Sequence, residues 1–70
     1  MLAVEDGTLK GLRRERKNAG LSQVRLSHLA GTSYNTVQRA EYGEPVGTRT
    51  LAKLANALGV SASALMEDER

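Results

Sequence analysis

The stretch SQVRLSHLAGTSYNTVQRAEYG, residues 22–43, predicts two short helices joined by a tight turn. Ser22 is a good N-cap for the first helix because its hydroxyl can accept a hydrogen bond from a free backbone amide. Gly31 follows that helix and can take the left-handed conformation that a sharp turn needs. Gly43 ends the second helix. Because helices of about two turns are unstable alone, both must pack on the rest of the chain.

Each of these two helices has an apolar side. Leu26, Leu29 and Ala30 are spaced i, i+3 and i+4, which places them on one face of the first helix. Val37 and Ala40 are three residues apart, and we expect both to be buried on the second helix. The five side chains should therefore contribute to a common core.

The other side of the second helix is polar. It is formed by Tyr34, Asn35, Gln38, Arg39 and Tyr42. Amide, guanidinium and hydroxyl groups of this kind hydrogen-bond to the edges of DNA bases and to phosphates. Their concentration on one short helix indicates a nucleic-acid partner.

Length and composition restrict the function. Seventy residues make one small domain, which is too small to enclose a sizeable substrate pocket. The sequence has no cysteine and a single histidine, His28, so it offers no disulfide, no thiolate metal site and no Ser–His–acid arrangement. We therefore expect no cofactor, no metal and no enzymatic activity. The lack of cysteine fits a reducing compartment such as the cytoplasm, and no apolar run is long enough to span a membrane.

Charge is distributed unevenly along the chain. The formal net charge is only +2, but residues 7–66 hold nine basic and three acidic residues, a surplus of six positive charges. The other acids lie near the ends. We expect a loose N-terminal arm over residues 1–7, one folded domain over residues 8–66 and an acidic tail over residues 67–70. A basic body suits a polyanionic partner, and a solvated charged surface explains this feature alone equally well.

Three further helices are predicted, which makes the chain all-α with five helices. The first covers residues 9–18 with Thr8 as its cap, and the fourth covers residues 49–58 with Thr48 as its cap. A short last helix follows Ser61. No strand pattern, repeat or low-complexity segment is present in the sequence.

The flanking helices supply the rest of the core. Leu9 and Leu12 begin an apolar row on the first helix, and the row continues through Arg16 and Ala19. Arg16 therefore occupies an inward-facing position. The fourth helix has the most regular apolar face, formed by Leu51, Leu54, Ala55 and Leu58.

Residue types and spacing over positions 9–66 together resemble a known family. The matching elements are GLSQ at 20–23, Leu26, AGTS at 30–33, Val37, Glu41, Gly43 and TLAKLANALGV at 50–60. This pattern resembles the lambda-repressor-like helix-turn-helix family, which includes phage repressors, Cro proteins and many small bacterial regulators. The resemblance implies a five-helix DNA-binding domain with its helix-turn-helix at the second and third helices.

The resemblance also implies roles for individual residues. The third helix, residues 33–42, would enter the DNA major groove while the second helix crosses the backbone. The residues at base-reading positions are Tyr34, Asn35, Gln38 and Arg39. The residues at phosphate-binding positions are Gln23, Ser33, Thr36, Tyr42 and Arg16. Arg16 and Glu41 match an ion pair between the first helix and the end of the third.

A basic run on the first helix adds one more phosphate candidate. Arg13 lies in this run with Lys10 and Arg14, and the three could reach phosphates if that end of the helix flanks the duplex. A solvated helix face explains the run equally well. Among the base readers, we expect Asn35 to pair with adenine and Arg39 with guanine.

The chain departs from the family pattern at several positions. Ser27 and Ala40 stand where alanine and a larger apolar residue are usual, and we expect the Ser27 hydroxyl to bond back within its own helix. Thr32 replaces a common valine, and Arg25 removes the capping box that Ser22 would otherwise have. Glu44 lies in a loop that is often basic, which argues against phosphate contacts from that loop.

The leading hypothesis is a sequence-specific regulator of transcription, of the repressor type, that binds double-stranded DNA. Since one domain makes only a small interface, we expect a homodimer on a near-palindromic operator, with the recognition helices about 34 Å apart. The expected dimer surface consists of Leu58, Val60, Leu65 and Met66.

The alternative is a protein-interaction module of the same fold, such as an antitoxin that binds a toxin or an adaptor that binds RNA polymerase. Such a module needs no base-reading side chains on its third helix. We would expect an apolar patch there instead.

Overall fold

A computed structural model describes residues 8–67 of the chain, and this part contains five helices and no strand. The helices are α1 (Leu12–Asn18), α2 (Gln23–Ala30), α3 (Tyr34–Glu41), α4 (Thr48–Leu58) and α5 (Ala62–Met66). The prediction of an all-α chain with five helices is therefore confirmed. The predicted arm, residues 1–7, and the predicted tail beyond Glu67 lie outside the described residues.

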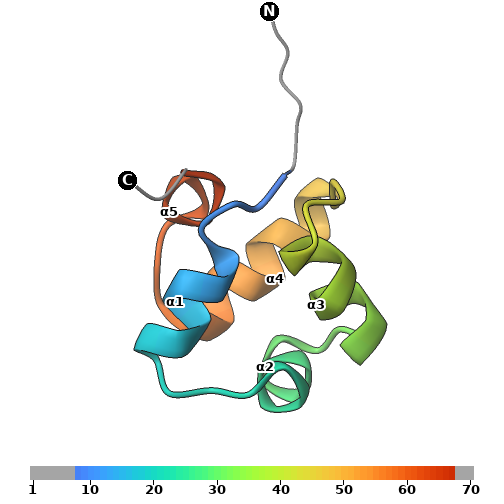
Figure 1. Cartoon of the computed structure of the whole chain (residues 1–70), viewed down its shortest axis with the longest axis vertical. Coiled ribbons are helices and arrows are strands. Elements are labelled where there is room, and N and C mark those ends of the chain that lie inside the picture. Colours follow the sequence, from blue (N-terminus) through green and yellow to red (C-terminus); the bar gives the residue numbers. More distant parts are fainter. Residues whose placement is uncertain (1–7, 68–70) are drawn as a thin grey trace, which may run out of the picture.

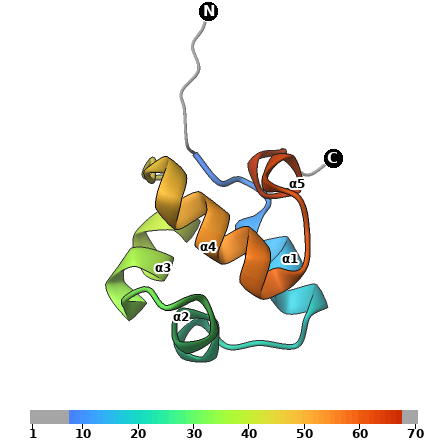
Figure 2. The same ribbon diagram turned by 180° about the vertical axis from the view of Figure 1, so that it is seen from behind.

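The helices are arranged around α4. Figures 1 and 2 show α4 crossing the middle of the molecule, with α1 and α3 to either side of it and α2 and α5 at opposite ends of the molecule. α2 packs against both α3 and α4, while α1 packs against α3 and α5. One side of α3 is thus held against the other helices, and its opposite side is left at the surface.

Serine caps begin three of the five helices. The hydroxyl of Ser22 accepts from the amide of Arg25 at 3.0 Å, and the hydroxyl of Ser33 accepts from that of Thr36 at 3.1 Å. Ser61 caps α5 in the same way. Each bond satisfies an amide that has no partner inside its own helix. The turn between α2 and α3 uses Gly31 at a φ of 73°, as the sequence predicts.

The core consists of leucine, valine and alanine side chains from all five helices and from the turn before α1. Its buried members are Leu9, Leu12, Leu26, Ala30, Val37, Ala40, Leu54, Ala55 and Leu65. At the contact of α2 with α3, Ser27 is buried and its hydroxyl donates to the carbonyl of Val24 at 2.6 Å. The expected back-bond within α2 is therefore present, and it supplies the partner that a buried hydroxyl needs.

α1 begins three residues later than predicted. Leu9 is buried, but it lies in a turn before the helix, and the N-cap is Gly11 rather than Thr8. The amide of Gly11 donates to the carbonyl of Leu65 at 2.7 Å. This bond ties the start of α1 to α5, and no side-chain cap bond is present at α1.

Three further predictions of local structure are wrong. Leu29 is 54% exposed, because the buried face of α2 is formed by Leu26, Ser27 and Ala30, and Leu29 lies roughly 100° around the helix from its centre. Ala19 is exposed because α1 ends at Asn18. α4 begins at Thr48 itself, because the extended backbone of Gly47 takes the N-cap position.

The structure also corrects the predicted dimer surface. Leu65 is completely buried in the core of this chain, so it cannot form part of an outer surface. Met66 next to it is 41% exposed, and Leu58 and Val60 are partly buried against the core. Only these three members of the predicted set remain accessible to a second copy.

The close contact of α1 with α5 generates a stability prediction. A Cβ added at Gly11 would lie 2.6 Å from the carbonyl oxygen of Ala64, a backbone atom that cannot move without displacing α5. Gly11→Ala should lower the free energy of unfolding by about 1–3 kcal/mol. Gly47→Ala is the matched control, because a Cβ there meets nothing within 4 Å. Denaturant unfolding of both variants measures the difference, and equal losses would contradict the prediction.

Candidate functional site

The outer face of α3 brings together the four predicted base readers. Tyr34, Asn35, Gln38 and Arg39 are spaced i, i+1, i+4 and i+5, so they form one strip along the helix. Tyr34 is 42% exposed, the Arg39 side chain is 71% exposed, Asn35 is exposed and Gln38 is half-buried. The donors and acceptors of this base-reading strip are therefore presented outward. Their contact with bases stays a prediction.

Two of the predicted phosphate contacts stand at the start of α3. The hydroxyls of Ser33 and Thr36 lie 2.8 Å apart, and Ser33 also caps the helix. Ser33 is exposed and Thr36 is half-buried. Each hydroxyl keeps capacity for a further hydrogen bond, because a hydroxyl offers one donor and two acceptor positions.

A buried carboxylate joins the three helices around the base-reading strip. The side chain of Glu41, at the end of α3, is 1% exposed. Its Oε2 accepts from Arg16 Nε of α1 at 2.6 Å, and its Oε1 accepts from Arg16 Nη2 at 3.2 Å and from Gln23 Nε2 of α2 at 2.8 Å. One acid thus fixes α1, α2 and α3 to one another.

The guanidinium of Arg16 is used within the protein. Besides its two bonds to Glu41, it donates from Nη1 to the carbonyl of Leu21 at 2.8 Å, and only 11% of the side chain is exposed. Arg16 therefore orients helices, and its phosphate contact stays a prediction without support from this geometry. The Glu41 hydrogen bond raises the pKa of Arg16, although burial acts in the opposite direction, so the group stays charged.

The ionisation of Glu41 is set by opposing effects. Burial alone raises the pKa of the Glu41 carboxyl, because a low-dielectric environment disfavours its charge. The hydrogen bonds from Arg16 and Gln23, together with the positive charge of Arg16, outweigh burial. The pKa of Glu41 therefore lies below its ordinary value, and the carboxylate is charged near neutral pH.

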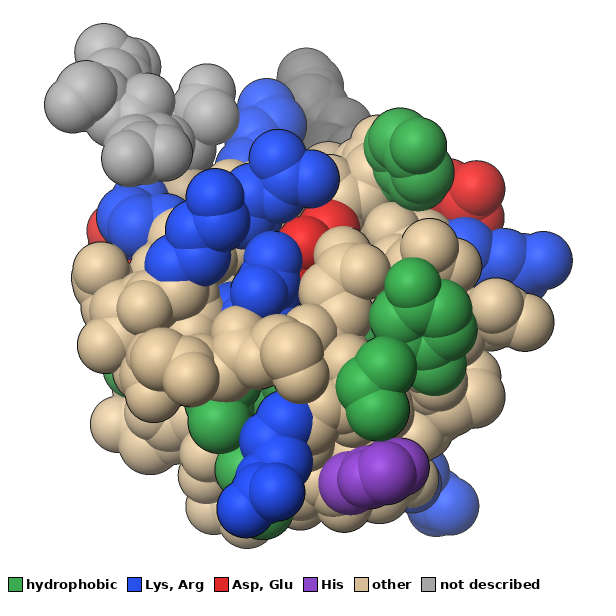
Figure 3. Space-filling view, turned by 60° about the horizontal axis from the view of Figure 1, so that its bottom comes forward, with side chains coloured by type: hydrophobic (Ala, Val, Ile, Leu, Met, Phe, Trp, Pro, Cys, Tyr) green, Lys and Arg blue, Asp and Glu red, His purple; other side chains and the backbone are tan. Residues whose placement is uncertain are grey.

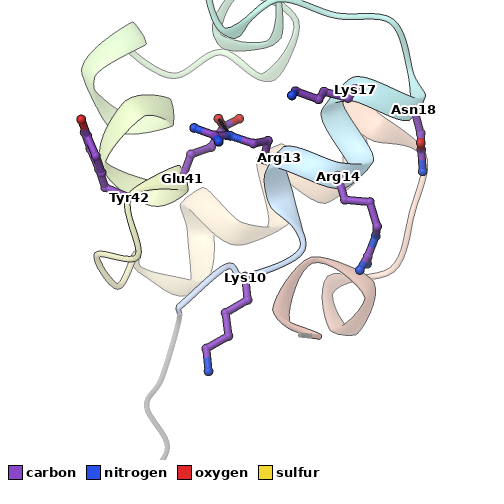
Figure 4. A pocket seen from close by; sticks show the side chains of 7 residues that line it. All are labelled: Lys10, Arg13, Arg14, Lys17, Asn18, Glu41 and Tyr42. Carbon is purple, nitrogen blue, oxygen red and sulfur yellow. Dashed lines mark hydrogen bonds and ion pairs between the residues drawn. The ribbon is translucent and has the colours of Figure 1, made fainter. Parts of the chain in front are cut away.

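A basic hollow adjoins this carboxylate on the outer side of α1. It has a volume of about 650 Å³ and is lined by Lys10, Arg13, Arg14, Lys17, Asn18, Glu41 and Tyr42. Figure 4 shows Arg13 and Lys17 extending from α1 toward α3, whereas Arg14 extends toward α5 and Lys10 points away. In Figure 3, lysine and arginine side chains gather around an acidic side chain on this face, and the histidine lies apart from them.

Only some of these cations are available to an anion. Arg13 is 62% exposed, and its Nε lies 3.5 Å from Glu41 Oε1. Lys17 is exposed. Arg14 instead donates to the carbonyl of Ala64 at 3.2 Å and pairs with Glu15, so it holds α1 against α5.

The basic hollow is continuous with the base-reading strip. A smaller hollow of about 210 Å³ lies between them and is lined by Arg13, Gln23, Gln38, Glu41 and Tyr42. Tyr42 is 86% exposed and borders both hollows. Side chains from α1, α2 and α3 thus form one surface that is rich in hydrogen-bond donors.

Sequence reasoning named Gln23 as a phosphate candidate but missed its contact with Glu41, and it did not single out Lys17. The contact of Gln23 with Glu41 is invisible in the sequence, because the two residues are eighteen positions apart on different helices. Lys17 follows Arg16, but its direction toward α3 depends on how α1 crosses the other helices. A helical-wheel projection of α1, with Arg16 turned inward, could have placed Lys17 beside Arg13, since residues four apart share a face.

Other kinds of site have no counterpart in residues 8–67. Within this range there is no group of three or more His, Cys, Asp or Glu side chains that could hold a metal ion. Among the same residues, no helix combines the length and the apolar character needed to cross a bilayer. His28 is exposed on α2.

Known proteins resemble this chain in sequence and in structure. A family model described as helix-turn-helix matches residues 12–65. Among solved structures, the restriction-modification controller protein C.AhdI from Aeromonas hydrophila is 35% identical, with 80% of this chain and 86% of that chain covered and a TM-score of 0.75. The hypothetical transcription factor NHTF from Neisseria is 27% identical, with 97% and 88% covered and a TM-score of 0.78. Comparison with curated proteins gives no match.

The contribution of the Glu41 carboxylate to stability can be tested by a nearly isosteric substitution. Glu41→Gln removes the negative charge and leaves the cation of Arg16 in a mostly buried position without a counter-charge. The free energy of unfolding at neutral pH should fall by about 3 kcal/mol or more. Chemical denaturation measures this value, and an unchanged stability would show that the ion pair has no structural role.

The same ion pair predicts how stability depends on pH. Because the folded-state pKa of Glu41 lies below its ordinary value of 4.5, its stabilisation is fully present above that value and is lost as the pH falls through the folded-state pKa. The stability difference between the wild type and Glu41→Gln should be constant between about pH 7 and about pH 5 and shrink in more acidic solution. A difference that stays constant in acid would contradict this prediction.

Proposed function

This chain belongs to the lambda-repressor-like helix-turn-helix family of DNA-binding transcriptional regulators, and we propose that it represses transcription as a homodimer on a near-palindromic operator. α3 reads bases in the major groove, and α1, α2 and both ends of α3 hold the phosphate backbone. The family consists of DNA-binding proteins without enzymatic activity. A regulator of this type acts in the cytoplasm of a prokaryotic cell, on the cell's own DNA or on phage DNA.

The observation that carries the proposal is the two-sided character of α3. Val37 and Ala40 are completely buried, while the side chains of the base-reading strip project outward from positions 34–39 of this eight-residue helix. A helix of that length is about 12 Å long, and the major groove is about 12 Å wide. The strip therefore fits a single groove segment, with Asn35 suited to adenine and Arg39 to guanine.

Phosphate binding would use the surface that flanks the strip. Gln23 stands at the N-terminus of α2, where free amides and the helix dipole favour an anion, and its amide orientation is fixed by Glu41. Arg13 and Lys17 supply positive charge in the basic hollow, and Tyr42 supplies a hydroxyl at its edge. Ser33 and Thr36 would contact phosphate at the start of α3.

Dimerisation would use the accessible residues near the end of the chain. Leu58, Val60 and Met66 lie at the end of α4, in the following turn and on α5, and they form the part of the predicted dimer surface that is not in the core. Two copies related by a two-fold axis would place their α3 helices in successive major grooves. Similarity to a restriction-modification controller protein supports a regulatory role of this kind.

A module that binds only a protein, such as a toxin or RNA polymerase, has less support. Such a module would expose an apolar patch on α3. The outer face of α3 instead carries amide, guanidinium and hydroxyl groups. An additional protein partner remains compatible with DNA binding, and its contact would have to lie on another face.

Base reading by α3 can be tested by selection of bound sites from a random duplex library, followed by affinity measurements on single-base variants of the selected site. Arg39→Ala should lower discrimination at one base pair in each half-site by about 5- to 150-fold, because one bidentate contact to guanine is lost. Arg49→Ala, which removes an exposed arginine of α4, is the matched control and should leave base preference unchanged. Failure to recover any preferred sequence would refute the proposed function.

Phosphate binding in the basic hollow makes a separate prediction. Arg13→Ala and Lys17→Ala should each weaken binding to operator and unrelated duplexes alike and lower the slope of log affinity against log salt by about 0.9 per phosphate contact. Lys53→Ala on α4 removes an exposed cation outside the hollow and should leave the slope unchanged. Equal effects of all three substitutions would show that the hollow does not bind phosphate.

A further inference from the structure

An acidic residue stands directly beside the base-reading strip. Glu44 follows the end of α3, and its backbone amide donates to the carbonyl of Arg39 at 3.0 Å. Its carboxylate Oε1 lies 3.9 Å from Arg39 Nε. The same residue therefore contacts Arg39 twice, once through the backbone and once through the side chain. The backbone bond fixes the main chain of Glu44 beside Arg39, and the carboxylate extends from there.

Arg39 and Glu44 share a small hollow at the surface. It has a volume of about 180 Å³ and lies between α3 and the start of α4, and its other lining residues are Thr36, Pro45, Val46, Gly47 and Thr50. Among these lining residues, Arg39 is the only cation and Glu44 is the only anion. Both side chains are largely exposed, at 71% and 60%. An ion pair this exposed contributes little to folding stability.

We propose that Glu44 is a positioning residue that determines base specificity by directing Arg39 toward guanine and away from phosphates. This inference rests on the proposed function, because it requires Arg39 to enter the major groove. It adds a residue outside the recognition helix to those that set sequence preference.

The chemistry of the guanidinium group supports this assignment. Glu44 approaches Nε of Arg39, while no described hydrogen bond or ion pair involves the two terminal nitrogens. These nitrogens form the edge that binds O6 and N7 of guanine bidentately. A carboxylate at Nε thus restricts the long side chain without competing for the base-reading edge.

The negative charge of Glu44 has a second effect at a DNA surface. An unrestrained arginine on a flexible stem can turn to a phosphate on any sequence, which adds affinity without adding information. Glu44 opposes this contact, because its carboxylate offers Arg39 an alternative partner and repels nearby phosphates. Binding to unrelated DNA is therefore weakened more than binding to the operator.

The test uses Glu44→Gln, which keeps the size of the side chain and the backbone bond but removes the charge. Glu67→Gln is the matched control, because it removes one exposed negative charge at the end of α5. Both are made in the wild-type and Arg39→Ala backgrounds. Affinity is measured for the selected duplex, for the duplex altered at the base pair that Arg39 discriminates, and for an unrelated duplex. Circular dichroism reports helix content.

Glu44→Gln should lower discrimination at the Arg39 base pair by about two- to fivefold and raise affinity for the unrelated duplex by a similar factor. In the Arg39→Ala background it should leave discrimination at that base pair unchanged, and Glu67→Gln should leave it unchanged in both backgrounds. Unaltered discrimination in Glu44→Gln, or an equal loss in Glu67→Gln, would overturn the inference while the proposed function stands. A wild-type chain without any preferred sequence would overturn both.

Discussion

The geometry of this domain depends on the hydrogen bonds and the ion pair that the carboxylate of Glu41 forms. A buried negative charge is costly unless it is paired and hydrogen-bonded, and here the partners come from two other helices. Arg16 reaches it from α1 and Gln23 reaches it from α2, within 2.6–3.2 Å. The requirement to satisfy one charge therefore constrains three helices at once. The leucine core packs these helices together, but apolar packing is less directional than a set of charge-assisted hydrogen bonds.

This arrangement explains how an eight-residue helix can present a well-defined polar face to the surface. α3 is too short to be stable in isolation, so its direction is set by what it packs against. Val37 and Ala40 anchor one side in the core, and Glu41 anchors its end. On the outer side lie the polar side chains of Tyr34, Asn35, Gln38 and Arg39. The same carboxylate also fixes the amide of Gln23, so the outer face of α3 and the proposed phosphate contact at Gln23 are held by one group.

Acidic side chains have two different roles within this basic surface. Glu41 is buried and charged, and it organises the helices from within. Glu44 is exposed and lies beside Arg39, where we propose that it limits indiscriminate contacts with phosphates. Specificity is a difference between two affinities, so an interface can become more selective by weakening the wrong contact. The chain thus combines a surplus of positive charge with negative charges at Glu41 and Glu44.

Local chemistry made most of the fold predictable from the sequence. The caps Ser22, Ser33 and Ser61 and the turn at Gly31 depend on neighbouring residues alone, so helix positions followed from them. Two of the errors arose where distant parts of the chain meet. The start of α1 is set by the bond of Gly11 to Leu65, and the burial of Leu65 depends on how α5 docks.

The site could be predicted to a similar extent. The polar face of α3 follows from helical periodicity, and the pairing of Arg16 with Glu41 followed from family resemblance rather than from spacing. The contacts of Gln23 with Glu41 and of Glu44 with Arg39 depend on side-chain geometry. No rule of sequence spacing specifies such contacts between helices or across a loop.

The most direct test of the role of α3 is an NMR titration of the isotope-labelled chain with a duplex selected from a random library. Binding through α3 predicts that the backbone amide signals of residues 33–42 and of Gln23 shift strongly, with smaller changes at Arg13 and Lys17. If the chain binds the duplex while the signals of residues 33–42 stay in place, α3 does not enter the groove, and the assignment of its outer face to base reading is wrong.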